Sequence, residues 1–162
     1  MKAMQITRPN RGFSLLELLV TLAILGVLAG GALQLRELAV QRSKEQDLRS
    51  ALRDIREAID AYKRASDGGR LAKAADASGY PRQLSELVDG VVDARNPRAA
   101  KIYFLRRLPR DPMAQASLPA DQTWGLRSYD SPPDAPRAGA DVFDVASMSE
   151  RLGLNGRPYN GW

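Results

Sequence analysis

One carboxylate, that of Glu17, lies inside a long apolar stretch near the start of the sequence. Its neighbourhood reads RGFSLLELLV, residues 11–20, where Gly12 separates a basic leader from the apolar residues. An ionised carboxylate within a membrane span costs at least about 2.5 kcal/mol, so such residues usually have a partner. Glu17 is therefore the residue whose chemistry needs explaining, and a cation is the partner that it needs.

Other chemistries are excluded by composition. The chain of 162 residues has no histidine and no cysteine, which rules out disulfides, thiol nucleophiles, zinc fingers and histidine-based acid–base catalysis. The serine, aspartate and lysine residues form no recognisable catalytic constellation, so we expect no enzyme. The net charge is +5, but Lys2, Arg8 and Arg11 contribute three of these charges. Elsewhere arginine alternates with acidic residues, so we expect no nucleic-acid partner.

The apolar stretch, residues 13–35, has the length of a membrane-spanning helix. It holds one charge in 23 positions, and a helix of that length covers about 35 Å. The basic leader, residues 1–12, should stay on the cytoplasmic side, with the remainder of the chain on the other side. Glycines interrupt the stretch at Gly26, Gly30 and Gly31, which fits either a slightly flexible span or a helix that packs closely or melts locally.

The helical pattern continues beyond the apolar stretch. Proline is absent between Pro9 and Pro81, so one helix over residues 14–65 is the simplest prediction, ending near the glycines of residues 66–69. Its second half carries an apolar stripe at spacings of four and three, which predicts a helix face packed under a small sheet: Leu48, Leu52, Ile55, Ile59 and Tyr62.

Shorter elements are predicted after the helix. Residues 71–81 resemble a loop, residues 82–92 a short helix, and residues 100–112 an apolar segment that ends in a proline-bounded turn. Strands are predicted at residues 123–130 and 140–147, followed by an irregular tail. The expected fold class is α+β, with a long N-terminal helix packed by a small antiparallel β-sheet.

The opening segment, RGFSLLELLV, closely resembles the class III signal sequence of type IV pilins and type II secretion pseudopilins. The resemblance implies a pilin-like fold and cleavage by a prepilin peptidase between Gly12 and Phe13. It also implies N-methylation of Phe13 and makes Glu17 the fifth residue of the mature chain. The free amine of Phe13 would then be a cation for Glu17, either in the same subunit or in a neighbouring one, and both pairings stay open.

Later segments resemble the major pseudopilins, the general secretion pathway protein G family. They are YPRQLSEL, FLRRLPRDP, WGLRSY and DVFDVAS, at residues 80–87, 104–112, 124–129 and 141–147, and the final Trp162. The resemblance implies a leader over residues 1–12, a transmembrane and filament-core helix over 13–35, and a periplasmic pilin-like domain over 36–162, helical to about residue 65.

Function and partners follow from the same resemblance. It implies a structural subunit that polymerises into the pseudopilus of a type II secretion system and supports export of folded proteins. The expected partners are the prepilin peptidase, further copies of the chain, minor pseudopilins, an inner-membrane platform, a cytoplasmic secretion ATPase, and membrane lipid before assembly. The alternative is a subunit of a type IV pilus or a DNA-uptake filament, although the lack of cysteine and the short C-terminal domain favour secretion.

The sequence departs from the resemblance at its tail. Members of that family bind calcium through a C-terminal loop rich in aspartate, whereas this tail has no aspartate after Asp144. Calcium requires six to eight oxygen ligands, including carboxylates. We therefore expect no cofactor, and the weak calcium candidates are Asp144, Ser147 and Asn155.

Overall fold

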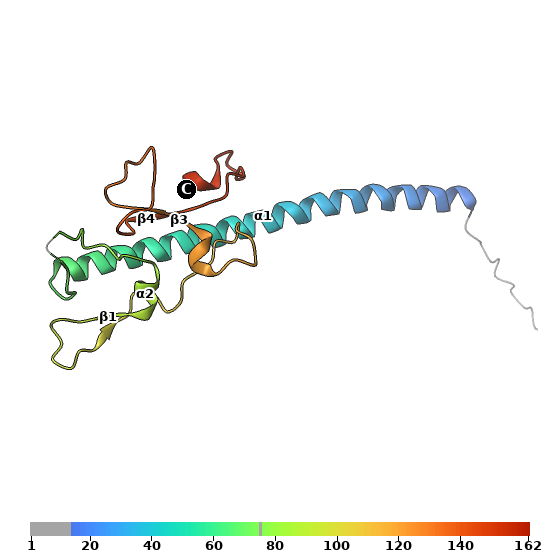
Figure 1. The fold of residues 1–162 in the computed structure, drawn as a ribbon. Coiled ribbons are helices and arrows are strands. Elements are labelled where there is room, and N and C mark those ends of the chain that lie inside the picture. The colour runs from blue at the N-terminus through green and yellow to red at the C-terminus, as the bar shows by residue number, and fades with distance from the viewer. Residues whose placement is uncertain (1–13, 75) are drawn as a thin grey trace, which may run out of the picture. The chain divides into compact units, whose positions relative to one another are not determined.

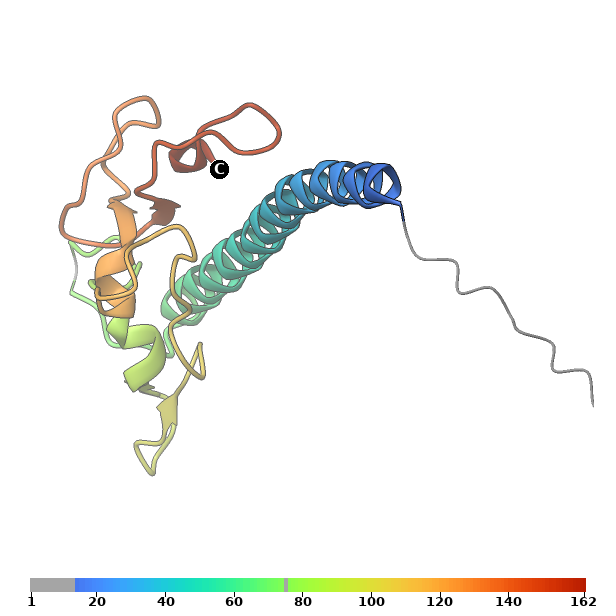
Figure 2. The same ribbon diagram turned by 90° about the vertical axis from the view of Figure 1, so that its right-hand side faces the viewer.

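The computed structural model describes residues 14–74 and 76–162, with the backbone alone for residues 29–35. The chain divides into two compact units, Met1–Val40 and Gln41–Trp162, and each is considered by itself. The ribbon in Figure 1 is coloured along the chain, and Figure 2 shows the same ribbon turned by a quarter.

The helix α1, Leu15–Asp67, confirms the predicted long helix. It begins after Ser14, whose hydroxyl accepts a hydrogen bond from the Glu17 N–H at 3.1 Å, as an N-cap residue does. It ends at Asp67, two residues before Gly69, whose φ of +66° suits glycine. The Arg70 N–H then donates to the Ala65 carbonyl at 2.9 Å, the closing bond of a Schellman motif.

The two units differ in how their apolar side chains are covered. In the first unit the apolar side chains of residues 15–28 are exposed in the single chain, for example Leu15 at 80% and Val27 at 77%. Within the described residues, no helix has both the length and the apolar character that crossing a membrane requires. The predicted span of residues 13–35 includes Phe13 and the side chains of residues 29–35, which lie outside the described part.

The second unit has a hydrophobic core built on α1. Its predicted stripe is buried at Leu48, Leu52, Ile55 and Ile59, and Tyr62 packs against the same core. The strands β3, Trp124–Arg127, and β4, Asp144–Ser147, pair antiparallel with Trp124 opposite Ser147. The core is completed by Ala51, Ala58, Leu84, Leu87, Trp124, Val142, Val145 and Tyr159. The predicted α+β fold, a long helix packed by small antiparallel sheet, is therefore confirmed.

The segment after the helix differs from its prediction. The helix α2 covers only Ser85–Asp89, not residues 82–92. It stops because Gly90 has a φ of 75°, after which β-branched residues favour extended backbone. Val91–Val92 thus form β1, which pairs antiparallel with β2, Lys101–Ile102. This second two-stranded sheet lies within segments that were predicted as helix and as an apolar turn.

The two strands are shorter than the predicted segments 123–130 and 140–147. Beyond Arg127, the buried Asp141 carboxylate forms the hydrogen bonds in place of strand pairing. It accepts hydrogen bonds from the Ser128 hydroxyl at 3.0 Å and the Tyr129 N–H at 2.8 Å. Short 3₁₀ turns, Ala120–Thr123 and Tyr159–Gly161, precede β3 and close the tail. Figures 1 and 2 both show the tail and the β1–β2 hairpin at opposite ends of this unit.

Candidate functional site

The first turn of α1 positions Glu17, the residue that the sequence singles out. Ser14 and Glu17 are spaced as in a capping box, and the Ser14 hydroxyl accepts the Glu17 N–H. The Ser14 carbonyl also accepts the Leu18 N–H at 3.1 Å. The start of the helix is therefore capped by Ser14, and the Glu17 carboxylate is not needed for that purpose. The predicted processing residues Gly12 and Phe13 lie outside the described residues.

The Glu17 carboxylate is exposed in the single chain. Among the described residues it makes no ion pair and no side-chain hydrogen bond. An acid in the first turn of a helix is already favoured by the helix dipole. The carboxylate is thus free to pair with a cation while the start of the helix stays capped.

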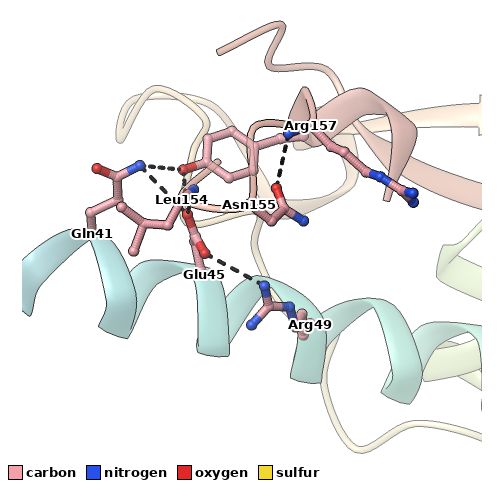
Figure 3. Close-up of polar contacts among 7 residues, drawn as sticks. Gln41, Glu45, Arg49, Leu154, Asn155 and Arg157 are labelled. Carbon is pink, nitrogen blue, oxygen red and sulfur yellow. Dashed lines mark hydrogen bonds and ion pairs between the residues drawn. The ribbon is translucent and has the colours of Figure 1, made fainter. Parts of the chain in front are cut away.

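A second polar cluster holds the tail of the chain against α1. Figure 3 shows Gln41, Glu45 and Arg49 on the helix, with Leu154 and Asn155 of the tail above them. The Glu45 Oε1 atom accepts the Leu154 N–H at 2.7 Å and the Tyr159 hydroxyl at 3.1 Å. Glu45 is only 3% exposed. A buried carboxylate with such partners binds the tail firmly, because each bond is charge-assisted.

The surroundings of Glu45 complete this cluster. The Gln41 Nε2 atom donates to the Tyr159 hydroxyl oxygen at 3.1 Å, and the Arg49 guanidinium lies 3.5 Å from Glu45 Oε2. Burial raises the pKa of the Tyr159 phenol above its ordinary value, and the Glu45 carboxylate adds to this effect while Gln41 opposes it. Tyr159 therefore stays protonated and acts as a donor to Glu45 at neutral pH.

Arg56 fixes the end of the chain from the same helix. Its Nε atom donates to Asp144 Oδ1 at 2.7 Å, and its Nη2 atom donates to the backbone oxygens of Val145 and Trp162. The tail is thus hydrogen-bonded to α1 at two places, by the Glu45 carboxylate and by the Arg56 guanidinium.

The structure does not bring the three calcium candidates together as a ligand set. Asp144 pairs with Arg56, the Ser147 hydroxyl donates to Asp111 Oδ2 at 2.6 Å, and Asn155 Oδ1 accepts the Arg157 N–H at 3.0 Å. Within residues 14–74 and 76–162, no group of three acidic side chains is arranged to hold a metal ion. The oxygens of these candidates are used in protein contacts.

Two residues that hold these structural features, Ser14 and Glu45, were not singled out from the sequence. Ser14 could have been found from the sequence, since a serine three residues before a glutamate at the start of an apolar run is the pattern of a capping box. Glu45 has no such sequence pattern, because its partner Tyr159 lies 114 residues further along the chain. Only the fold identifies that contact.

Comparison with known proteins supports the reading of the N-terminus. Residues 7–33 match the family model of the prokaryotic N-terminal methylation motif. No curated protein and no solved structure matches the chain. The matched residues include Gly12, Phe13 and Glu17, so the motif covers the second half of the predicted leader, the predicted junction and the first turns of α1. The chain therefore carries the prokaryotic N-terminal methylation motif, the prepilin-type signal of type IV pilin-like proteins.

Proposed function

We propose that the chain is a structural pseudopilin, which polymerises into the periplasmic pseudopilus of a type II secretion system and supports export of folded proteins. The observation that carries the proposal is the methylation motif at residues 7–33, with Glu17 in the first turn of α1. A subunit with this motif is cut by a prepilin peptidase after Gly12, and Phe13 becomes its N-methylated first residue.

The exposed apolar side chains of residues 15–28 support an assembling role. A large exposed apolar surface marks a membrane or protein interface. In the proposed cycle these side chains contact lipid before assembly, with a single pass through the inner membrane, the N-terminus in the cytoplasm and the C-terminal domain in the periplasm. In the filament they contact the same segment of neighbouring subunits, so apolar surface is covered in both states.

Glu17 sets the register between subunits in this proposal. A neighbouring Phe13 amine is a cation that a correctly placed subunit brings to the carboxylate. A misplaced subunit leaves two charges unpaired in an apolar core, which is costly. The capping of α1 by Ser14 supports this role, since it leaves the carboxylate available.

The remaining partners belong to the secretion machine. The proposal includes minor pseudopilins, the inner-membrane platform and the cytoplasmic secretion ATPase, which supplies the work of extracting subunits from the membrane. The alternative function is a subunit of a type IV pilus or a DNA-uptake filament. The absence of cysteine favours the pseudopilus, because pilins of that kind often carry a C-terminal disulfide.

Deletion of the gene separates the two functions. The proposal expects folded proteins that normally reach the medium to accumulate in the periplasm, and export to return when the wild-type gene is restored. Surface pili, twitching motility and DNA uptake are measured in the same strains. Normal export combined with loss of pili or of DNA uptake would replace the pseudopilus by the alternative filament.

A further inference from the structure

Arginine side chains gather around a hollow between α1 and the tail of the second unit. The hollow has a volume of about 410 Å³. Two parts of the chain far apart in sequence build it, the middle of α1 and the last eight residues. Its lining is Arg49, Leu52, Arg53, Arg56, Asn155, Arg157, Gly161 and Trp162.

Two of the four guanidinium groups have no counter-charge within the described residues. Arg56 is paired with Asp144, and Arg49 lies near Glu45 while its guanidinium stacks over the Trp162 ring at 4.4 Å. In the described part of the chain, the side chains of Arg53 and Arg157 make neither an ion pair nor a hydrogen bond. Like charges so placed repel one another, and a bound anion would relieve this repulsion.

The indole of Trp162, which lines the hollow, adds a second observation. Its Nε1 atom is buried and has no hydrogen-bond partner among the described residues. The other indole, that of Trp124, donates to the Pro109 carbonyl at 2.9 Å. A buried donor without a partner costs free energy, so an acceptor that reached this indole would stabilise the folded chain.

We propose that this hollow binds a phosphate group, either free or carried by a small organic molecule. Two unpaired guanidinium charges match a divalent oxyanion, and the planar fork of arginine suits phosphate oxygens. The volume exceeds that of the oxyanion, and the apolar surfaces of Leu52 and Trp162 can contact an attached organic group. This proposal does not rest on the proposed function, because the lining of the hollow shares no residue with the methylation motif or with the apolar residues 15–28.

The Trp162 indole provides the test. The full chain is labelled with ¹⁵N at its two indoles, purified in a nonionic detergent, and titrated with inorganic phosphate at constant ionic strength set with chloride. We expect saturable movement of the Trp162 Nε1–H resonance, assigned with Trp162→Phe, while the Trp124 resonance stays in place. Failure of the Trp162 resonance to move, or equal movement of both resonances, would overturn the proposal.

Charge removal and competing ligands make the test specific. Arg53→Ala combined with Arg157→Ala should raise the half-saturating phosphate concentration about tenfold or more. Arg64→Ala, an exposed arginine of the same helix outside the hollow, should leave it unchanged. An unchanged half-saturating phosphate concentration in the double variant would contradict the proposed site. Glycerol phosphate binding more tightly than phosphate would support an organic phosphate, whereas tighter binding of succinate would overturn the choice of phosphate.

Discussion

At Glu17 the backbone N–H takes part in capping the helix, whereas the side-chain carboxylate does not. The Ser14 hydroxyl satisfies the Glu17 N–H, so the carboxylate is available for a cation. In an apolar environment a charge pair is far stronger than in water, and an unpaired charge is far more costly. In the proposed function, cleavage would create an amine at Phe13 that meets this need, either in the same subunit or in the next one.

Replacement of Glu17 tests its role in assembly. Glu17→Ala should insert into the membrane normally, but its filament yield should fall at least about tenfold, because a buried amine without its partner costs about 3–5 kcal/mol. The yield is measured by shearing filaments and immunoblotting. The matched control is Glu37→Ala, an exposed acid of α1 further from the junction. A wild-type yield from Glu17→Ala would rule out the assembly role.

Glu45 is the residue on which the position of the tail depends. Removing its carboxylate leaves the Leu154 N–H and the Tyr159 hydroxyl without their acceptor. Glu45→Ala should therefore lower the free energy of unfolding by about 1–3 kcal/mol, which is the cost of an unsatisfied buried donor such as the Tyr159 hydroxyl. Tyr159→Phe removes only one of these bonds and should cost less.

Denaturant unfolding of the full chain, followed by tryptophan fluorescence, measures both changes. Asp47→Ala is the control, because Asp47 lies on the same helix but is exposed. If Glu45→Ala unfolded at the same denaturant concentration as Asp47→Ala, the tail would not depend on Glu45.

At the level of elements, Tyr62 connects α1 with α2. Its hydroxyl donates to Glu86 Oε2 at 2.9 Å, and its ring packs on Phe104 at 5.2 Å between centroids. Burial raises the pKa of the Tyr62 phenol well above its ordinary value, and the hydrogen bond to Glu86 raises it further. The contact between the two helices therefore depends on the phenol keeping its proton.

This raised pKa predicts a loss of stability in alkali. The folded chain holds the proton more tightly than the unfolded chain, so the contribution is complete below about pH 10, the ordinary tyrosine value, and is lost as the pH rises further. Tyr62→Phe keeps the ring but removes the proton, so its unfolding temperature should fall less steeply between pH 9 and 11 than that of the wild type. If the unfolding temperatures of Tyr62→Phe and the wild type fell equally with pH, the raised pKa of Tyr62 would not contribute to stability.

The main elements were predictable because their signals are local. The apolar stripe, the absence of proline and the paired glycines predicted α1 to within two residues at its C-terminal end. The positions of β3 and β4 followed from alternation and from β-branched and aromatic residues. Such patterns record which face of an element is buried, and burial decides secondary structure in these segments.

The remainder depends on contacts between distant residues. The two-residue strands β1 and β2 are too short to show a period, and Gly90 stops α2 through its backbone conformation. Likewise, no spacing in the sequence pairs Glu45 with Tyr159 or Arg56 with Asp144. The processing site was predicted from its motif alone, since Gly12 and Phe13 lie outside the described residues.

At the scale of the molecule, the chain combines an exposed apolar helical segment with a folded second unit. The folded unit is held by its core and by the polar contacts of Glu45 and Arg56 with the tail. Four arginines line the hollow beside that tail, an environment that repels cations. We therefore propose that the folding of this chain is independent of calcium.

Chelation tests this independence. Addition of EDTA to the full chain should shift the unfolding temperature by less than about 1 °C, because a metal that does not bind the native state cannot stabilise it. Added calcium should likewise have no effect. A drop of several degrees with EDTA, reversed by calcium, would establish a calcium site near Asp144, Ser147 and Asn155 after all.

The central claim is that the chain is a processed subunit of a pilin-like filament. Mass spectrometry of the N-terminus, after expression with an active prepilin peptidase, tests it most directly. We predict a chain that begins at N-methylated Phe13, and an uncut chain for Gly12→Val. A wild-type chain that keeps residues 1–12 in the presence of the active peptidase would contradict the account.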